Sequence, residues 1–164
     1  MDMKKLNFGC GTDILPGWDN VDMQLGKGIF KSFDFDKFPY PLKNSTYDYV
    51  LMKQVLEHVL YPDRVLMELY RVCKNGAIIR IETAHYTNKG AYNDMQHLHY
   101  FNEVAFEGFV NSHVLIKKRM FKIRKLKVTP TIVGKFIPEI IRKSLSLFIN
   151  GLQSQIHCEY EVVK

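Results

Sequence analysis

Short apolar segments, each ending in a glycine or a polar residue, recur along the first half of the chain. They predict strands at residues 5–8, 20–22, 33–35, 47–52 and 77–84. The segment at 47–52 alternates poorly but is rich in residues that favour strands, as expected where both faces of a strand are buried. Strands of this kind are typical of a parallel sheet, so an α/β fold is expected.

Two helices are predicted among these strands. The clearer one begins at Pro62, which suits a first turn, and its apolar residues recur at helical intervals as far as Cys73. The Asn75-Gly76 pair is expected to end it. Asn102 is expected to cap a second helix that runs to about residue 110.

The last third of the chain predicts two further strands and an amphipathic helix. Residues 121–128 read as a strand with a slip in its alternation, and residues 156–162 alternate cleanly, so an antiparallel edge of the sheet is expected here. Residues 138–152 predict a helix with more apolar than polar positions. That pattern fits a lid, a dimer surface or a peripheral membrane contact, and equally a helix that packs against its own domain.

The first strand leads into a glycine-rich turn. Residues 6–12 read Leu-Asn-Phe-Gly-Cys-Gly-Thr, and Asp22 follows at the tip of the second strand. Two glycines let the backbone turn sharply and approach a ligand without intervening side chains. In nucleotide-binding α/β folds such a turn lies under the polar body of the ligand, and the carboxylate binds both ribose hydroxyls. Alone, the Gly-x-Gly pair also fits a plain tight turn.

Further segments follow in a characteristic order. They are residues 34–36 (Asp-Phe-Asp), 38–42 (Phe-Pro-Tyr-Pro-Leu), 45–50 (Ser-Thr-Tyr-Asp-Tyr-Val), 55–59 (Val-Leu-Glu-His-Val) and 74–76 (Lys-Asn-Gly). With the glycine turn, they resemble the class I S-adenosylmethionine-dependent methyltransferases, particularly the methyltransferase type 11 group, over about residues 4–110. The resemblance implies an α/β, Rossmann-like, doubly wound fold whose mostly parallel seven-stranded sheet has an antiparallel C-terminal edge.

The resemblance also implies the cofactor, S-adenosylmethionine, and the residues that hold it. The methyl group would lie above the glycine turn, the ribose on Asp22, and the adenine near Asp34 and Phe35. Gln54, which follows the strand at 47–52, is a candidate contact to cofactor or acceptor. The implied cofactor-binding residues are Asn7, Phe8, Gly9, Cys10, Gly11, Asp22, Asp34, Phe35 and Gln54.

Two features depart from the family pattern. Asn7 stands where the family usually has an acidic residue, and an amide cannot pair electrostatically with the ammonium group of the cofactor. Only ten residues separate Gly11 from Asp22, and they include Pro16 and Gly17. A parallel crossover needs about a dozen residues or more, so shortened first crossovers are expected.

Composition indicates a single soluble globular domain. The chain has 164 residues, of which 46% are hydrophobic and 24% charged, enough for one core. We expect a cofactor-binding core at residues 1–112, completed by C-terminal strands and a helix at 113–164. No apolar run approaches the roughly 20 residues of a membrane span, and no signal-peptide core follows the first residues, so a cytoplasmic protein is expected.

Positive charge is concentrated near the C-terminus. Residues 1–116 carry 12 Lys and Arg against 14 Asp and Glu, whereas residues 117–164 carry 11 against 3. The densest run is Lys117, Lys118, Arg119, Lys122, Arg124, Lys125 and Lys127. An anionic partner such as RNA, a phosphorylated sugar or a lipid headgroup would fit it, and so would a solvated strand face.

A segment rich in histidine, amide and aromatic residues spans positions 85–101. It follows a central strand, which is where a substrate-facing loop is expected. His97 and His99 are the first candidates for a general base, with His85, Glu82 and His58 as others, although His58 also fits a role in fixing its loop. Asp94, His97 and His99 are of residue types that bind metals, but His-x-His projects to opposite sides of an extended chain, and no metal is expected.

The resemblance implies transfer of a methyl group, and we expect an oxygen or nitrogen of a small-molecule acceptor to receive it by direct in-line displacement. The strand at 47–52 is not followed by an Asn-Pro-Pro-Tyr motif, so a nucleobase acceptor is not favoured. Two alternatives remain open: an RNA methyltransferase that uses the basic C-terminal surface, and a non-catalytic scaffold that keeps the fold. A dehydrogenase is disfavoured because Ile14 replaces the third glycine of Gly-x-Gly-x-x-Gly.

Overall fold

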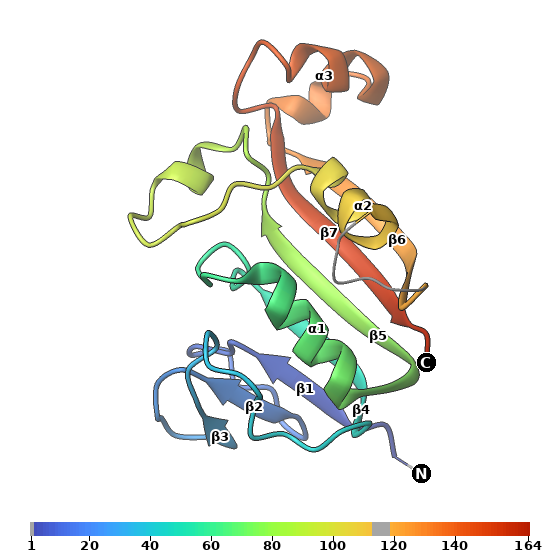
Figure 1. The fold of residues 1–164 in the computed structure, drawn as a ribbon. Helices are drawn as coiled ribbons and strands as arrows, with labels where there is room; N and C mark the ends of the chain where they lie inside the picture. The colour runs from blue at the N-terminus through green and yellow to red at the C-terminus, as the bar shows by residue number, and fades with distance from the viewer. Residues whose placement is uncertain (1, 113–118) are drawn as a thin grey trace.

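The computed structural model describes residues 2–112 and 119–164. Within them, seven strands form one sheet in the order β3-β2-β1-β4-β5-β7-β6 (Figure 1). Their bounds are β1 Lys5–Phe8, β2 Asp19–Asp22, β3 Lys31–Ser32, β4 Tyr47–Lys53, β5 Cys73–Ala84, β6 Phe121–Pro130 and β7 Gln153–Val162. β1 to β5 pair in parallel, and β7 is antiparallel to both β5 and β6. The predicted mostly parallel sheet with an antiparallel edge is therefore confirmed.

The connections on either side of β2 are short and lack a full helix. Residues 9–18 join β1 to β2 through turns, and residues 23–30 join β2 to β3 in the same way. The shortened crossovers expected from Pro16 and Gly17 are thus present. The third strand is displaced from its predicted position at 33–35, because Phe33 and Phe35 lie in the core as loop residues after β3.

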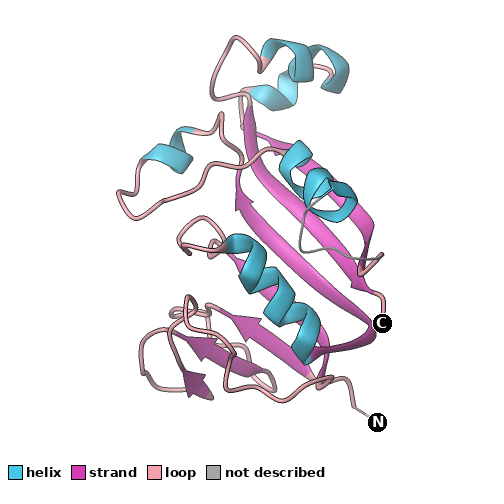
Figure 2. Ribbon diagram, viewed as in Figure 1, coloured by secondary structure: helices cyan, strands magenta, loops and turns pink. Residues whose placement is uncertain are grey.

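Two helices cover one face of the sheet. α1 (Pro62–Val72) and α2 (Glu103–Ser112) lie on the same side in Figures 1 and 2. Along β5 the buried residues alternate with half-exposed ones, as expected for a strand with one covered face. The opposite face of β1, β4 and β5 lines an open groove of about 680 Å³ that includes Trp18, Tyr49 and Arg80.

The boundary between α1 and β5 differs from the prediction. The helix ends at Val72, and β5 begins at once with Cys73, which pairs with Tyr47. The next pair is Tyr49 with Ile78, so the residues between Cys73 and Ile78 bulge out of the ladder. The Asn-Gly pair thus marks an irregularity inside a strand, where Gly76 takes a φ of 77°.

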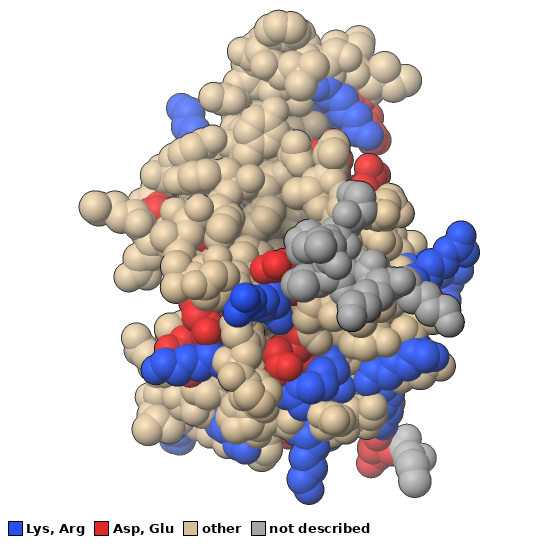
Figure 3. Space-filling model, in the orientation of Figure 1, with Lys and Arg blue, Asp and Glu red and all other residues tan. Residues whose placement is uncertain are grey.

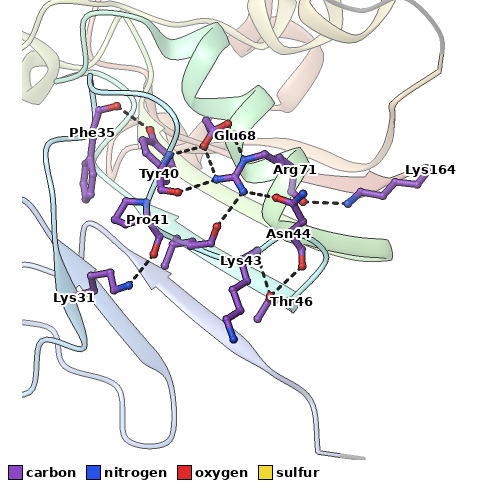
Figure 4. A network of polar contacts seen from close by, with 11 residues as sticks. Lys31, Phe35, Tyr40, Pro41, Lys43, Asn44, Thr46, Glu68, Arg71 and Lys164 are labelled. Carbon is purple, nitrogen blue, oxygen red and sulfur yellow. Dashed lines mark hydrogen bonds and ion pairs between the residues drawn. The ribbon is translucent and has the colours of Figure 1, made fainter.

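Polar contacts tie the segment between β3 and β4 to α1. The guanidinium of Arg71 donates to the carbonyl oxygens of Tyr40 and Leu42 at 3.0 and 2.9 Å, and also to Asn44. The Glu68 carboxylate accepts from the Tyr40 N–H at 2.7 Å (Figure 4). This segment carries Phe35, so the network fixes the residues next to the expected adenine site.

The third helix is shorter than predicted, and its buried residue is the polar Arg142. α3 covers Glu139–Leu145 and follows a short 3₁₀ turn, η2 (Gly134–Phe136). Arg142 is buried and donates to the carbonyl oxygens of Gly134 and Ile137 at 3.1 and 3.0 Å. Ile140 and Phe148 are 84% and 87% exposed. The apolar side of this segment therefore does not pack against its own domain.

Candidate functional site

The glycine turn closely contacts the loop that follows β4. Gly9 and Gly11 have φ values of 70° and 49°, in the left-handed region that favours glycine. The N–H groups of Gly9 and Cys10 both donate to the carbonyl oxygen of Val21, at 2.9 and 3.0 Å. A β-carbon on Gly9 would lie 2.2 Å from Cγ2 of Val55, so only glycine fits. The turn thus presents bare backbone at the carboxyl ends of β1 and β4.

Asp22 is joined directly to this turn. Its Oδ2 accepts from the N–H of Gly11 at 2.7 Å, and its Oδ1 accepts from the N–H of Gln24 at 3.2 Å. Each carboxylate oxygen can accept a second hydrogen bond, so both ribose hydroxyls can still be bound. Burial raises the pKa of the Cys10 thiol, and the charge of Asp22 raises it further, so Cys10 is an unreactive part of the turn.

Asn7 organises the shortened crossover. Its side chain is buried, and Nδ2 donates to the carbonyl oxygen of Asp13 at 2.7 Å and to Oδ1 of Asn20 at 2.9 Å. Asn20 in turn exchanges hydrogen bonds with the backbone of Leu15 and donates to Trp18. An aspartate at position 7 could not donate these bonds. The amide is thus suited to a connection without a helix, and a direct contact with cofactor stays a prediction.

The residues expected near the adenine lie in the core or at its edge. The rings of Phe8 and Phe35 are buried and stack with their centroids 4.1 Å apart, so only their backbone atoms can contact a ligand. The carboxylate of Asp34 is partly exposed. It accepts from the N–H of Asp36 at 2.9 Å and lies 3.4 Å from Nζ of Lys37.

Gln54 has a left-handed backbone at the carboxyl end of β4. Its φ is 51°, which is uncommon outside glycine, and its side chain is exposed. The N–H of Gln54 donates to the carbonyl oxygen of Glu82 at 2.8 Å, and this bond holds the turn in place. Residues kept in such conformations often lie at functional sites, and a contact of Gln54 with cofactor or acceptor stays a prediction.

The histidine-rich loop brings His97 against His58 and directs His99 elsewhere. The rings of His97 and His58 meet edge to face, with centroids 4.6 Å apart. His99 instead lies by Phe101, and its Nε2 is buried. His85 is buried, hydrogen-bonds Thr87 and lies near Glu103, and burial lowers its pKa although Glu103 acts to raise it.

The sequence did not identify Glu57. One possible ligand atom from each of Glu57, His58 and His97 lies within 4.8 Å of the others. Glu57 is 2% exposed, and its backbone carbonyl accepts from the N–H groups of Leu98 and His99 at 2.8 and 3.2 Å. The adjacent His58 could have drawn attention to this position in the sequence. The burial of Glu57, however, depends on a loop some 40 residues away in the sequence. Asp94 is not part of this group.

An apolar cavity lies beside the same loop. It has a volume of about 420 Å³ between α1 and α2, and Leu56, Leu66, Phe101, Phe106 and Phe109 are among the residues that line it. Leu56 directly precedes Glu57 in the chain. An apolar part of a small ligand would fit here, whereas the glycine turn offers polar backbone groups.

Acidic residues of β7 face the basic residues of β6. Lys122 pairs in register with Glu161, Lys125 pairs with Glu159, and Arg124 forms an ion pair with Glu161. Lys117 and Lys118 lie outside the described residues. Part of the predicted positive charge is therefore neutralised within the sheet.

Comparisons with known proteins agree with this geometry. The family model described as a methyltransferase domain, of the type 11 group, matches residues 10–81. No curated protein matches the chain in sequence.

Solved structures are similar over nearly the whole chain. An S-adenosylmethionine-dependent methyltransferase from Archaeoglobus fulgidus has a TM-score of 0.67 and 17% identity, covering 97% of this chain and 86% of that one. One from Mesorhizobium loti has a TM-score of 0.66 and 13% identity, covering 97% and 90%. Phosphoethanolamine N-methyltransferase 2 of Haemonchus contortus has a TM-score of 0.67 and 13% identity, covering 100% and 49%. At these identities the likeness establishes the fold.

Proposed function

We propose that the chain is a class I S-adenosylmethionine-dependent methyltransferase that methylates an oxygen or nitrogen of a small-molecule acceptor. The match of the methyltransferase-domain model to residues 10–81 and the likeness in fold to solved methyltransferases support this. The observation that carries the proposal is the direct hydrogen bond from the Gly11 N–H to Oδ2 of Asp22. This bond joins the glycine turn, which is proposed to lie under the polar part of the cofactor, to the carboxylate that is proposed to bind the ribose. A tight turn that binds no ligand would not require a carboxylate at this position.

The residues at the carboxyl ends of β1, β2 and β4 fit S-adenosylmethionine. A β-carbon on Gly9 would collide with Val55, so the turn is kept bare, and Asp22 retains free lone pairs on both oxygens. When bound, the cofactor supplies a methyl group on a positively charged sulfur. Gly9, Cys10 and Gly11 would lie beneath its methionine portion, with Asp22 on the ribose, and Asp34 and the Phe35 backbone at the adenine. Asn7 and the Phe8 backbone would support the turn.

The chain has two remaining tasks, which are to orient the acceptor and to remove a proton. Methyl displacement needs the reacting atoms in line, so positioning is the larger of the two. Gln54, with its exposed side chain at the carboxyl end of β4, is the proposed contact to the acceptor or the cofactor. His97 and His99 are the proposed proton acceptors. Of the two, His97 is better placed, because its ring lies against His58 whereas His99 turns toward Phe101.

A small acceptor is better supported than RNA. The apolar cavity beside Leu56 suits a compact group, and the pairing of β6 lysines with β7 glutamates weakens the basic surface that RNA would need. RNA binding would be strongly reduced by added salt, which a filter-binding assay can measure. The scaffold alternative predicts cofactor binding without turnover.

The segment 132–149, here called the apolar lobe, is proposed as a contact with an anionic membrane surface. Its exposed apolar side chains are Ile132, Val133, Phe136, Ile140, Ile141, Leu147, Phe148 and Ile149. Lys135 and Lys143 lie in the same segment with exposed side chains, and Glu139 forms an ion pair with Lys143. The segment keeps a net positive charge, which complements anionic headgroups. Figure 3 shows a largely uncharged cap at this end of the molecule, with basic side chains at its edge. In the described residues, no helix is long and apolar enough to cross a membrane.

Calorimetric titration with S-adenosylmethionine and S-adenosylhomocysteine tests the proposal, with NADH as the control ligand. We expect saturable binding of the first two alone. Absence of binding to either would contradict the cofactor assignment. Binding without methylation of any compound in a panel of alcohols, amines and phosphorylated head groups would favour the scaffold.

A further inference from the structure

Glu57, His58 and His97 come together beside the glycine turn from two separate loops. Glu57 and His58 follow β4, and His97 belongs to the segment between β5 and α2. One possible ligand atom from each lies within 4.8 Å of the others. The β4 loop also carries Val55, which contacts Gly9. The group therefore lies next to the proposed cofactor site.

Backbone carbonyls fix both imidazole rings. Nδ1 of His97 lies 2.7 Å from the carbonyl oxygen of Ala91, and Nδ1 of His58 lies 3.3 Å from that of Gln96. A carbonyl oxygen can only accept, so each Nδ1 must carry the hydrogen, and in the neutral ring Nε2 keeps its lone pair. Histidines that bind metals are held in this way, with the second ring nitrogen donating to a carbonyl or carboxylate.

Glu57 provides the second, independent observation. Its side chain is 2% exposed, and neither carboxylate oxygen has a hydrogen-bond partner among the described residues. A buried carboxylate is costly unless it is hydrogen-bonded, paired with a charge or bound to a metal. Two imidazoles with free lone pairs cannot donate to it, but all three groups can share one cation.

We propose that Glu57, His58 and His97 bind a divalent transition-metal cation of the Zn²⁺ type. One carboxylate and two imidazoles are a donor set that such cations prefer, and three protein ligands leave coordination positions open. Bonds of about 2.0–2.1 Å in a tetrahedral site put ligand atoms roughly 3.3 Å apart, so the ligand atoms would close in by at most about 1.5 Å. The set differs from Asp94, His97 and His99, which the sequence suggested.

The open positions suit an acceptor hydroxyl, and this part of the inference rests on the proposed function. A cation lowers the pKa of an oxygen bound to it, so the hydroxyl would lose its proton to solvent without a protein base. His97 would then be a ligand, which replaces the role proposed for it above. Metal binding itself requires no cofactor and can be measured alone.

The test is titration of chelator-treated, dialysed full-length protein with Zn²⁺ by calorimetry and with Co²⁺ by visible absorption. We expect one cation per chain and Co²⁺ bands of a low-coordinate site. Glu57→Gln and His97→Gln should each weaken Zn²⁺ binding at least about tenfold. His157→Gln, in which an imidazole near Glu82 on the sheet is lost, is the matched control and should bind as the wild type does.

Two results would overturn the inference: no saturable binding by the wild-type chain, or equal affinity in the wild type, Glu57→Gln and His97→Gln. Circular dichroism of each variant verifies folding, and His58→Gln replaces any variant that fails. Zn²⁺ binding without binding of S-adenosylmethionine would refute only the proposed function. The reverse result would refute only the metal site.

Discussion

The N–H of Gly11 donates to Oδ2 of Asp22 at 2.7 Å, and this hydrogen bond links the first parallel strand to the second at their carboxyl ends. In the absence of a full crossover helix, Asp22 serves both the loop and the proposed ligand. Its two oxygens each accept one backbone N–H and retain capacity for one more hydrogen bond. The site is therefore formed mainly by backbone groups and one carboxylate.

Replacement of Asp22 by alanine should abolish tight cofactor binding. The ribose would lose two hydrogen bonds to a charged group, each worth about 1.5–3 kcal/mol, so affinity should fall at least about 100-fold. Calorimetric titration with S-adenosylhomocysteine measures this. Asp13→Ala is the control, because that carboxylate is 61% exposed and pairs with Lys53. Unchanged affinity in Asp22→Ala would refute the ribose assignment.

Gly9→Ala should destabilise the protein more than Gly17→Ala. Both glycines have positive φ, which costs an alanine about 1–2 kcal/mol. Only at Gly9 would the new β-carbon also meet a side chain, at 2.2 Å from Val55, so a total of about 2–4 kcal/mol is expected. Chemical denaturation gives both free energies of unfolding. Equal losses would show that the contact with Val55 relaxes without cost.

Asn7→Asp restores the acidic residue that the family usually has, yet it should destabilise this chain. The carboxylate would face the Asp13 carbonyl oxygen and Asn20 Oδ1, two acceptors that the amide now satisfies. Burial without a donor should cost about 3 kcal/mol at neutral pH. Asn150→Asp, at an exposed loop position, is the control in urea denaturation. A variant as stable as the wild type would mean that the crossover does not depend on this amide.

Local patterns predicted most of the strands and the antiparallel C-terminal edge of the sheet. The glycine turn, the acidic residue at position 22 and the short spacing between them are determined by residues near one another in sequence. The cap at Asn102 was also correct, and its Oδ1 accepts from the N–H of Ala105 at 3.0 Å. Such features depend on backbone geometry, which neighbouring residues largely determine.

Features that depend on distant contacts were not predictable. The burial of Glu57 follows from a loop around residue 98, and no local pattern indicates it. Amphipathicity correctly suggested a helix near residue 140 but left open which of its residues face inward. Arg142 is buried because the carbonyls of Gly134 and Ile137 accept its hydrogen bonds. Hydrophobic periodicity counts arginine as polar and therefore cannot predict that it is buried.

His85 should make the protein less stable in mild acid. Burial lowers its pKa below the ordinary 6.5, so below that pH the unfolded chain binds more protons than the folded one. Stability is then fully present above pH 6.5 and declines as the pH falls toward the native pKa. Asp48 does not interfere, because a hydrogen bond from Lys74 lowers its pKa from 3.8. Denaturation between pH 7 and 5 should show a flatter profile for His85→Gln than for the wild type or His157→Gln.

Two substitutions in the apolar lobe should remove binding to anionic vesicles. Ile140→Ser with Phe148→Ser deletes side chains that are 84% and 87% exposed, so folding should be unaffected. Insertion of either side chain into lipid is worth about 1.5–3 kcal/mol, so co-sedimentation with phosphatidylglycerol vesicles should weaken at least about 100-fold. Leu25→Ser, at a position 86% exposed and outside the lobe, should bind as the wild type does. A different result would contradict the membrane proposal: the wild type does not bind vesicles, and analytical ultracentrifugation shows a wild-type dimer that the double variant cannot form. The lobe would then be an interface between two copies of the chain.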